Sequence, residues 1–354
     1  MQIKNFQNRI IPWYNLNKRN LSFRGIKDPY KIWLSEVMLQ QTQVSTAIPY
    51  FNKWVRKFPT LGSVANADPE LLLKYWEGLG YYSRCLNFYK ASKIIINEFN
   101  GVIPSEWNTF RELPGVGDYT AAAVLSIAFK KKYVVIDGNV KRVMSRFLGI
   151  KNLTPNNLRR IKKKLEQFIP EKNPGDFNQS IMELGAIVCR PRNPICNDCP
   201  ISSDCKAYLT LKPDQYPNPK KNKTKPHYII VAGIIWRKNL FYIQKRDENG
   251  MLGGLWEFPG GKVEKNEPLL KALIRKIEEE CGIVPMVKQK IGYISHQYSH
   301  FSITFHVYHC IENKNKIEEA KFSAWIAPEQ IKQYAFPKAN HKIFKIIEDK
   351  GWNV

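Results

Sequence analysis

Two carboxylates lie in sequence contexts that suit acid–base chemistry. Glu36, in WLSEVMLQQTQV, is surrounded by apolar residues of a helical stretch, and partial desolvation favours the neutral, proton-donating form of a carboxyl group. Asp137, in VVIDGNVKRV, precedes a helical stretch, where an aspartate can stay ionised near the helix N-terminus. One neutral acid and one ionised carboxylate are the pair that hydrolyses a glycosidic bond. Two simpler explanations stay open: a helix N-cap for Asp137 and a buried, paired acid for Glu36.

Four of the seven cysteines could bind a metal centre. Four thiolates close together in the sequence can wrap one soft metal centre. Structural zinc sites usually pair two short C-x2–4-C units, which the spacing C-x6-C-x2-C-x5-C lacks. From the residues alone, zinc and an iron–sulfur cluster both remain open, and the three isolated cysteines are expected to be structural. The four clustered residues are Cys189, Cys196, Cys199 and Cys205, and the isolated ones are Cys85, Cys281 and Cys310.

A glycine-containing turn stands between two helical stretches. The string LPGVGDY holds Gly115, Val116 and Gly117, and its glycines permit a sharp change of chain direction. Backbone N–H groups at the start of the following helix can bind a phosphate group without reading a base. An ordinary turn between antiparallel helices would have the same sequence features.

Helical patterns dominate the chain up to residue 210. Asp28-Pro29 indicates an N-cap followed by a proline in the first turn, and an apolar-periodic helical stretch is predicted from there to about Arg56. Further helical stretches are predicted over 68–77, 83–99, 105–112, 118–131, 139–148, 155–168 and 175–188.

The pattern changes after a segment rich in proline and lysine. LKPDQYPNPKKNKTKP, residues 211–226, is predicted to be an interdomain linker, although an ordered loop along one domain would fit too. Downstream, HYIIVAGIIWR, LFYIQKR, KIGYISHQY and FSITFHVYHC are rich in β-forming residues, and one helix is predicted at 267–281. The sequence therefore predicts an all-α domain over 1–210, with a cysteine loop at 189–205, and a smaller α/β domain over 227–354.

Composition narrows the class of partner. The 354 residues carry a net charge of +24 and are 44% hydrophobic, which excludes a disordered chain and favours a polyanion such as nucleic acid. The largest share of the positive charge lies upstream of residue 211. No apolar run is long enough to span a membrane and the start lacks the apolar core of a secretory signal, so no membrane partner and a cytoplasmic location (bacterial cytosol or nucleoid) are expected.

Taken together, the motifs resemble one family. SEVMLQQTQV, LPGVG, VIDGNVKRV and the cysteine spacing resemble those of the MutY-like adenine DNA glycosylases, in the endonuclease III or helix-hairpin-helix superfamily. The resemblance extends over nearly the whole chain. It implies a structural [4Fe–4S] cluster held by the four clustered cysteines, and double-stranded DNA held through its backbone by the turn at 115–117.

The resemblance also implies a reaction. Glu36 would protonate the adenine at N7 and help to deliver water, Asp137 would stabilise the oxocarbenium-like sugar, and Tyr119 and Asn139 would support these two. Members that resemble endonuclease III have a lysine at the position of Tyr119, which forms a Schiff base with the sugar. A tyrosine cannot form a Schiff base, so no lyase step is expected.

Contacts to the mispair are implied in the same way. Gln41 and Thr42, from QQT, and Leu79 and Tyr81, from GLGYYSR, correspond to residues that probe the mispair and wedge into the base stack. Because Leu79 stands between two glycines and Tyr81 follows the second of them, we expect both to be exposed. Arg24 is expected near the adenine pocket.

The C-terminal part resembles a Nudix domain. GGKVEKNEPLLKALIRKIEEECGI fits G-x5-E-x7-R-E-U-x-E-E-x-G-U except at Lys276, where the pattern has a glutamate, and a cation among ligand carboxylates should weaken Mg²⁺ binding. MutY-like proteins use such a domain to recognise 8-oxoguanine without hydrolysis, and Tyr298, Ser299 and His300 correspond to the loop that contacts this lesion. The matching positions are Gly261, Glu267, Arg275, Ile277, Glu279, Glu280, Gly282 and Ile283.

The resemblance predicts a monofunctional glycosylase, acting as a monomer, that excises adenine opposite 8-oxoguanine or guanine in double-stranded DNA. The alternatives are a glycosylase for another mispaired base or with weak lyase activity, an additional nucleotide pyrophosphohydrolase in the C-terminal domain, and a non-enzymatic iron–sulfur DNA-binding module. The pair of carboxylates argues against the last of these.

Overall fold

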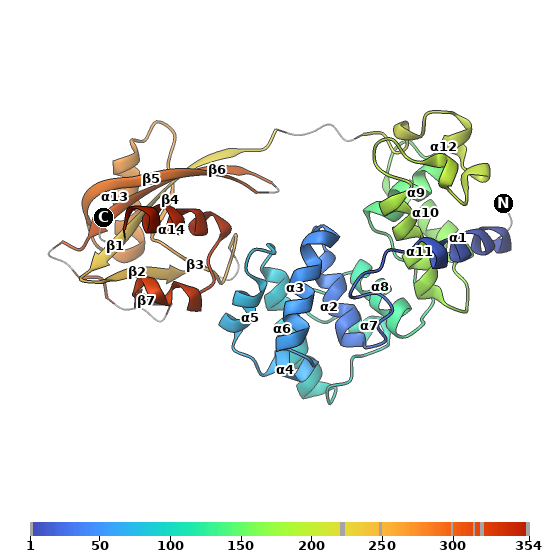
Figure 1. Ribbon diagram of the computed structural model, residues 1–354, viewed down its shortest axis with the longest axis horizontal. Coiled ribbons are helices and arrows are strands. Elements are labelled where there is room, and N and C mark those ends of the chain that lie inside the picture. The colour runs from blue at the N-terminus through green and yellow to red at the C-terminus, as the bar shows by residue number, and fades with distance from the viewer. Residues whose placement is uncertain are drawn as a thin grey trace. The chain divides into compact units, whose positions relative to one another are not determined.

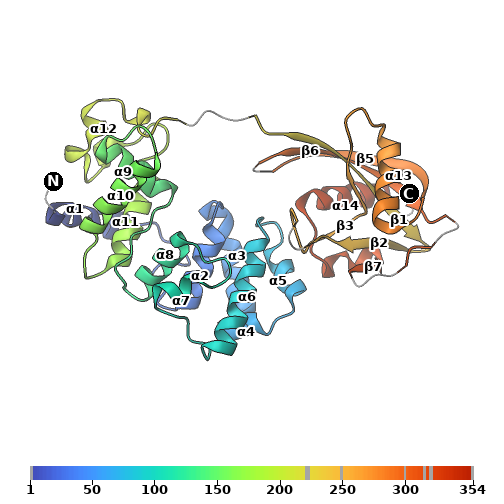
Figure 2. The same cartoon turned by 180° about the vertical axis from the view of Figure 1, so that it is seen from behind.

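Two compact units make up the chain. The computed structural model describes residues 3–219, 224–247, 250–298, 300–313, 316–318 and 322–351. Unit 1 comprises residues 1–66 and 87–222, and unit 2 comprises residues 67–86 and 223–354. Unit 1 is helical, whereas unit 2 is built around a β-sheet (Figures 1 and 2). The predicted fold class, an all-α part followed by an α/β part, is therefore confirmed, and the domain boundaries at 210 and 227 stay a prediction.

Several helices of unit 1 begin at a side-chain cap. The side chain of Asp28 accepts a hydrogen bond from the Tyr30 N–H, and Thr154 caps a later helix in the same way, each just before a proline. α6 (Ser83–Glu98) begins in unit 2 and continues in unit 1. The other helices of unit 1 are α1 (Ile3–Asn17), α2 (Pro29–Leu39), α3 (Val44–Lys57), α4 (Leu61–Ala65), α7 (Trp107–Arg111), α8 (Asp118–Ala128), α9 (Gly138–Leu148), α10 (Pro155–Phe168), α11 (Pro174–Ile187) and α12 (Lys206–Leu209).

The single helical stretch predicted from Asp28 to about Arg56 is wrong. α2 ends at Leu39 and α3 begins at Val44. Between them Gln41 has a φ of 55°, in the left-handed region, where an α-helix cannot continue. The break leaves Gln41 and Thr42 on a loop. α1 was not predicted at all.

Apolar clusters hold unit 1 together, and two of them show how its helices pack. In the first, Trp33 of α2 lies with its ring 4.6 Å from that of Phe88 and 5.4 Å from that of Phe110. In the second, Phe6 of α1 stacks on Phe168 of α10 at 4.4 Å, and α9 and α11 complete the cluster. Three of the clustered cysteines pack against this second core, which fixes the cysteine loop to α9 and α11.

The sheet of unit 2 has the strand order β3-β2-β1-β6-β5, with β4 paired to β1 and β7 to β2. β1 and β6 run parallel, and the other pairs are antiparallel. The strands are β1 (His227–Arg237), β2 (Leu240–Lys245), β3 (Trp256–Glu257), β4 (Gly260–Lys262), β5 (Met286–Gln297), β6 (Ser302–Ile311) and β7 (Ser323–Ile326), and the helices are α5 (Pro69–Trp76), α13 (Leu269–Cys281) and α14 (Lys338–Lys350).

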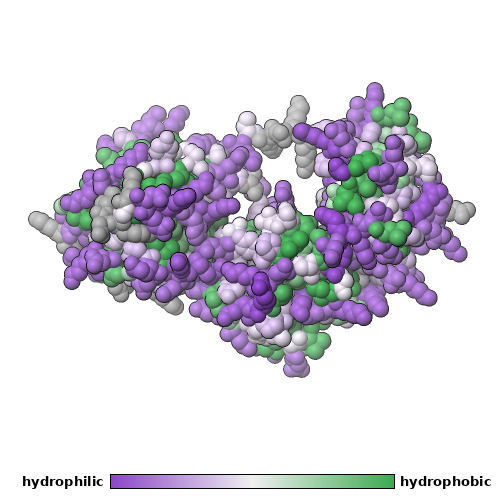
Figure 3. Space-filling view, in the orientation of Figure 1, coloured by the Kyte–Doolittle hydropathy of each residue, from purple (hydrophilic) through white to green (hydrophobic). Residues whose placement is uncertain are grey.

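Both faces of this sheet are covered. Along β1, Val231 and Ile235 face the cluster that contains α13, whereas Ala232 and Ile234 face the cluster that contains α14, as the period of two in a strand requires. The sequence predicted one helix here, and α14 is a second. Polar residues cover most of the molecular face seen in Figure 3, with apolar groups scattered among them.

Candidate active site and cysteine loop

A buried carboxyl group receives a phenol hydrogen bond. Glu36 lies on α2 and is 7% exposed, and the Tyr119 hydroxyl, from the first turn of α8, donates to Glu36 Oε2 at 2.6 Å. Burial raises the pKa of Glu36 to about 7; the Tyr119 hydrogen bond acts against this rise, and the nearby Asp137 charge adds to it. Burial and the same carboxyl group raise the pKa of Tyr119 well above 10, so this phenol keeps its proton.

Asp137 has both carboxylate oxygens engaged. It is the N-cap of α9, where Oδ1 accepts the Val140 N–H at 2.6 Å and Oδ2 accepts the Asn139 side-chain amide at 3.0 Å. Asp137 therefore does cap α9, as the simpler explanation from the sequence proposed. One cavity of about 380 Å³ is lined by Asp137 together with Glu36, Tyr119 and Asn139. The structure thus brings together the four residues that the sequence singled out for catalysis.

A buried ion pair on the same cavity was missed from the sequence. Glu183 of α11 is 1% exposed and accepts hydrogen bonds from the Arg19 guanidinium at 2.7 and 2.9 Å and from Arg24 at 3.0 Å. Burial alone would raise the pKa of Glu183, but these bonds outweigh it and lower the pKa to about 2. Arg24 lines the cavity as predicted, and its buried Nε and Nη1 have no hydrogen-bond partner among the described residues.

A chain of hydrogen bonds joins Asp137 to the cysteine loop. Asn139, which holds Asp137, accepts a hydrogen bond from Arg142 at 2.8 Å. Arg142 also donates to the Cys189 and Gly185 carbonyl oxygens, both at 2.8 Å. A side chain at Gly185 of α11 would meet Asn139 at 2.6 Å, so α11 and α9 pack closely. Arg142 was not predicted to belong to the site.

The predicted glycine turn joins α7 to α8. Gly115 has a φ of 77°, and a Cβ there would lie 2.8 Å from the Asn87 side chain, so both conformation and space require glycine. Val116 is 3% exposed and lies under the turn. A Cβ at Gly117, in contrast, would meet no atom within 4 Å. The backbone at the start of α8 is therefore open for a ligand to approach.

The four clustered cysteines line one small cavity of about 20 Å³. Arg146 of α9 is 2% exposed, lies 3.4 Å from the Cys189 sulfur through Nη1, and donates to the Arg190 and Pro191 carbonyl oxygens at 2.6 and 3.0 Å. This buried guanidinium offers positive charge to the sulfur. Within the described part of the chain, no three His, Cys, Asp or Glu side chains gather closely enough to hold one metal ion.

The segment after the cysteine loop is tied to unit 1. Arg146 Nε donates to the Pro213 and Tyr216 carbonyl oxygens at 2.9 and 3.0 Å. Asn218 donates through its backbone to the Lys151 carbonyl at 2.7 Å. The first part of the predicted linker is therefore an ordered strap.

Two predicted mispair residues lie on the loop between α2 and α3. Thr42 lines the 380 Å³ cavity, and Gln41 is exposed beside it in the sequence. The preceding Gln40 donates through its side-chain amide to the Thr120 hydroxyl at 2.9 Å, which ties this loop to the start of α8.

Unit 2 brings Tyr81 and His300 together. The Tyr81 hydroxyl lies 3.1 Å from His300 Nε2. Tyr298 is half-buried and stacks on Phe301 at 4.6 Å, while Ser299 lies outside the described residues. The prediction that Leu79 is exposed is wrong: it is 6% exposed, because its N–H bonds to the Trp76 carbonyl at 3.0 Å and folds the turn back onto α5.

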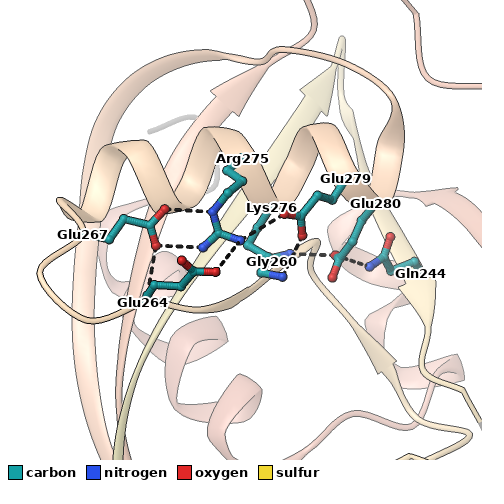
Figure 4. A network of polar contacts seen from close by, with 8 residues as sticks. All are labelled: Gln244, Gly260, Glu264, Glu267, Arg275, Lys276, Glu279 and Glu280. Carbon is teal, nitrogen blue, oxygen red and sulfur yellow. Dashed lines mark hydrogen bonds and ion pairs between the residues drawn. The ribbon is translucent and has the colours of Figure 1, made fainter.

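Four of the five acidic side chains in the Nudix-like segment, Glu264, Glu267, Glu279 and Glu280, bond to protein groups (Figure 4). Glu267 receives two hydrogen bonds from Arg275, at 2.8 and 2.7 Å, and Arg275 also donates to Glu279 at 3.0 Å. Lys276 Nζ lies 2.7 Å from the second oxygen of Glu279. Glu264 forms an ion pair with Arg275 at 3.8 Å. Glu280 accepts hydrogen bonds from the Gln244 side-chain amide at 2.6 Å and from the Gly260 N–H at 3.0 Å.

Comparison with known proteins agrees with this arrangement. Residues 34–171 match the family described as HhH-GPD superfamily base excision DNA repair protein, and residues 231–345 match the NUDIX domain. A solved structure described as a thermostable thymine-DNA glycosylase superposes with a TM-score of 0.54, at 28% identity, covering 59% of this chain and 97% of that one. Among the described helices, none is long and apolar enough to cross a membrane.

Two relatives align along almost the entire chain. An adenine DNA glycosylase of Buchnera aphidicola subsp. Schizaphis graminum is 35% identical over 98% of this chain and 100% of its own length. The mouse adenine DNA glycosylase is 32% identical over 97% of this chain and 78% of its own length. The chain belongs to the adenine DNA glycosylase family.

Proposed function

We propose that this glycosylase removes adenine opposite 8-oxoguanine or guanine by hydrolysis alone, without a lyase step that cleaves the DNA strand. The observation that carries the proposal is the Glu36–Tyr119 hydrogen bond on the same cavity as Asp137. A protonated acid and an ionised carboxylate on one cavity fit the cleavage of a bond between a base and a sugar.

Glu36 is the general acid. With a pKa of about 7, it holds its proton in a large fraction of molecules at neutral pH. That proton passes to N7 of the adenine, the N9–C1′ bond breaks, and its electron pair leaves with the base. The Glu36 carboxylate then accepts a proton from the water whose oxygen bonds to C1′, which restores the acid.

Asp137 stabilises the positive charge that develops on the sugar. The Val140 N–H and the Asn139 amide donate to its two oxygens, and these bonds fix the orientation of the carboxylate. Tyr119 stays protonated and orients Glu36. Because a tyrosine cannot form a Schiff base with the sugar, the product is an intact strand with an abasic site.

Arg24 and Glu183 read the edge of the flipped base. Both line the cavity, and the Arg24 guanidinium is a donor group suited to acceptor nitrogens of a purine. Because Arg19 and Arg24 keep Glu183 ionised, its carboxylate can accept from an exocyclic amino group. A base that presents a carbonyl oxygen at that point would face the carboxylate unpaired.

Double-stranded DNA is the partner. The open backbone at Gly117 offers N–H groups to a phosphate. A groove of about 960 Å³ begins beside Tyr119 and is lined by basic side chains among acidic ones, and the charge of +24 adds long-range attraction. The basic side chains are Lys132, Lys141, Arg159 and Lys162. The protein acts on this DNA as a monomer in the cytoplasm.

The opposite base is 8-oxoguanine in the preferred substrate. Tyr81 and His300 form one polar pair, and Tyr298 follows β5 in the same loop as His300. An aromatic ring and a hydrogen-bonding imidazole together can stack on a purine and read its edge.

The four clustered cysteines hold a [4Fe–4S] cluster. Their four sulfur donors line one cavity, and cysteine thiolates are the ligands that iron–sulfur clusters use. When bound, the cluster supplies structure to the loop, while Arg142 and Arg146 connect that loop to α9.

The C-terminal domain is not proposed as a nucleotide pyrophosphohydrolase. Lys276 and Arg275 already neutralise the charge of carboxylates that would bind Mg²⁺. The domain instead serves to recognise the base opposite the adenine. A base-release assay on duplexes with A:8-oxoguanine, A:G, A:T and T:G pairs tests the whole proposal, with alkali omitted in one arm. Adenine should be released from the first two duplexes, with strand cleavage only after alkali. Thymine release, or cleavage without alkali, would contradict it.

A further inference from the structure

Helix α5 comes from the glycosylase part of the sequence but packs within unit 2. Glu70 lies in its first turn and Glu77 is the residue that caps its C-terminal end; they are seven residues apart, which is about two helical turns and places them on one side of the helix. Lys74 lies between them on the same face. Each of these three side chains bonds to the C-terminal part of unit 2.

The first contact is made at the start of α5. One oxygen of Glu70 accepts the indole N–H of Trp256, from β3, at 2.7 Å, and the other pairs with Lys245 at the end of β2. Trp256 is 8% exposed. A charge-assisted bond to a buried indole is strong and directional, so it fixes the edge of the sheet against α5.

The second contact is made at the other end of α5. Glu77 Oε1 accepts the Phe336 N–H and His341 Nε2, both at 2.8 Å, and Lys74 donates to the Tyr334 carbonyl at 2.8 Å. Burial alone would raise the pKa of Glu77, but the bond from His341 and the others lower it below its usual value. The ionised carboxylate thereby holds the segment before α14 and the first turn of α14.

Tyr81 follows α5 after a short, rigid turn. The Trp76 indole donates to the Gly80 carbonyl at 3.1 Å, and Gly78 and Gly80 both have positive φ. Tyr81 itself has a φ of 48°, and its hydroxyl reaches His300 Nε2 at 3.1 Å. The place of Tyr81 relative to His300 therefore depends on how the sheet is seated on α5.

We propose that Glu70 and Glu77 are positioning residues for recognition of the base opposite the adenine. They hold the sheet on α5, and the position of the sheet on α5 determines where Tyr81 lies relative to His300. The inference rests on the proposed function, in which that pair reads 8-oxoguanine. Neither glutamate contacts the DNA. Their loss therefore changes discrimination between 8-oxoguanine and guanine opposite the adenine, while the chemistry at Glu36 continues.

The test compares Glu77→Ala with Glu77→Gln, which keeps an acceptor for the Phe336 N–H. Glu98→Ala, at an exposed position of α6, is the control. The readout is the ratio of single-turnover excision rates for A:8-oxoguanine and A:G. We expect Glu77→Ala to lower this ratio by about tenfold, the size of one lost charge-assisted hydrogen bond, with the A:G rate unchanged. Glu77→Gln should lie between wild type and Glu77→Ala.

A double-mutant cycle separates positioning from general damage. In a His300→Ala background, Glu77→Ala should lower the ratio no further, because both changes act on one pair. Additive losses, or an equal loss on both duplexes, would overturn the proposal.

Hydrogen exchange provides a readout independent of activity. Glu77→Ala should speed exchange of the Phe336 amide and of residues 300–303, and unchanged protection would also overturn the proposal. A wild-type protein without preference for 8-oxoguanine would instead contradict the proposed function. The exchange measurement alone would then show whether Glu77 holds the sheet on α5.

Discussion

The Tyr119 hydroxyl lies 2.6 Å from Glu36 Oε2, and this hydrogen bond joins the start of α8 to the middle of α2. In the proposed mechanism this hydroxyl orients the acid. The resemblance gives the lyases of the superfamily a lysine at the position of Tyr119, so we propose that this position bears both on the expected absence of a lyase step and on the orientation of Glu36.

Glu36→Gln is expected to abolish adenine release. An amide of nearly the same shape cannot donate the proton, and general acid–base catalysis contributes about 10²- to 10⁴-fold. Duplex binding should persist, because Glu36 is 7% exposed and lies below the surface. Single-turnover excision and a binding titration measure the two effects, with Glu98→Gln as control. Normal excision by Glu36→Gln would refute the acid role.

The excision rate should fall as pH rises through about 7. Glu36 acts in its protonated form, and its pKa is raised to about 7, mainly by burial. The Tyr119 hydrogen bond works against that rise, so Tyr119→Phe should move the alkaline limb to higher pH while it lowers the maximal rate. A pH–rate profile under single-turnover conditions checks the direction, and a limb moved to lower pH in Tyr119→Phe would contradict it.

The same acid should cost stability at high pH. A folded-state pKa raised above 4.5 adds stability that is present at low pH and is lost as pH rises through about 7. Glu36→Gln should therefore be more stable than wild type above neutral pH, by up to about 3 kcal/mol, and the difference should shrink towards pH 5. Urea unfolding at pH 5 and pH 8.5 measures it, and an equal difference at both values would argue against burial of a titrating acid.

Local signals were sufficient for most elements. β1 begins and ends as predicted, because its β-branched run is bounded by polar residues, and α10 covers the predicted residues 155–168. The break at Gln41 could not be predicted, since it depends on a left-handed φ beside the contact of Gln40 with Thr120. That contact joins residues 80 positions apart.

The candidate site likewise contains residues that local sequence could predict and residues that it could not. Glu36 and Asp137 were found because each has a local context that predicts its ionisation. Glu183 has the same buried context as Glu36, but its role depends on Arg19, 164 positions away. The placement of α5 in unit 2 rests on bonds such as that from Trp256 to Glu70, which span 186 positions, and no local pattern reveals such bonds.

Lys276→Glu should make the stability of the protein depend on Mg²⁺. In the wild type, the Lys276 ammonium lies 2.7 Å from Glu279 and supplies positive charge where the Nudix pattern has a metal-binding glutamate. Reversing that charge adds a carboxylate beside Glu279 and leaves Arg275 as its remaining cationic partner, so the repulsion between carboxylates on α13 destabilises the folded state. Millimolar Mg²⁺ should restore the melting temperature of Lys276→Glu and leave the wild type unchanged. Lys271→Glu, at an exposed position of the same helix, is the matched control and should show no response. A wild type stabilised by Mg²⁺ to the same extent would mean that the segment still binds the metal despite Lys276.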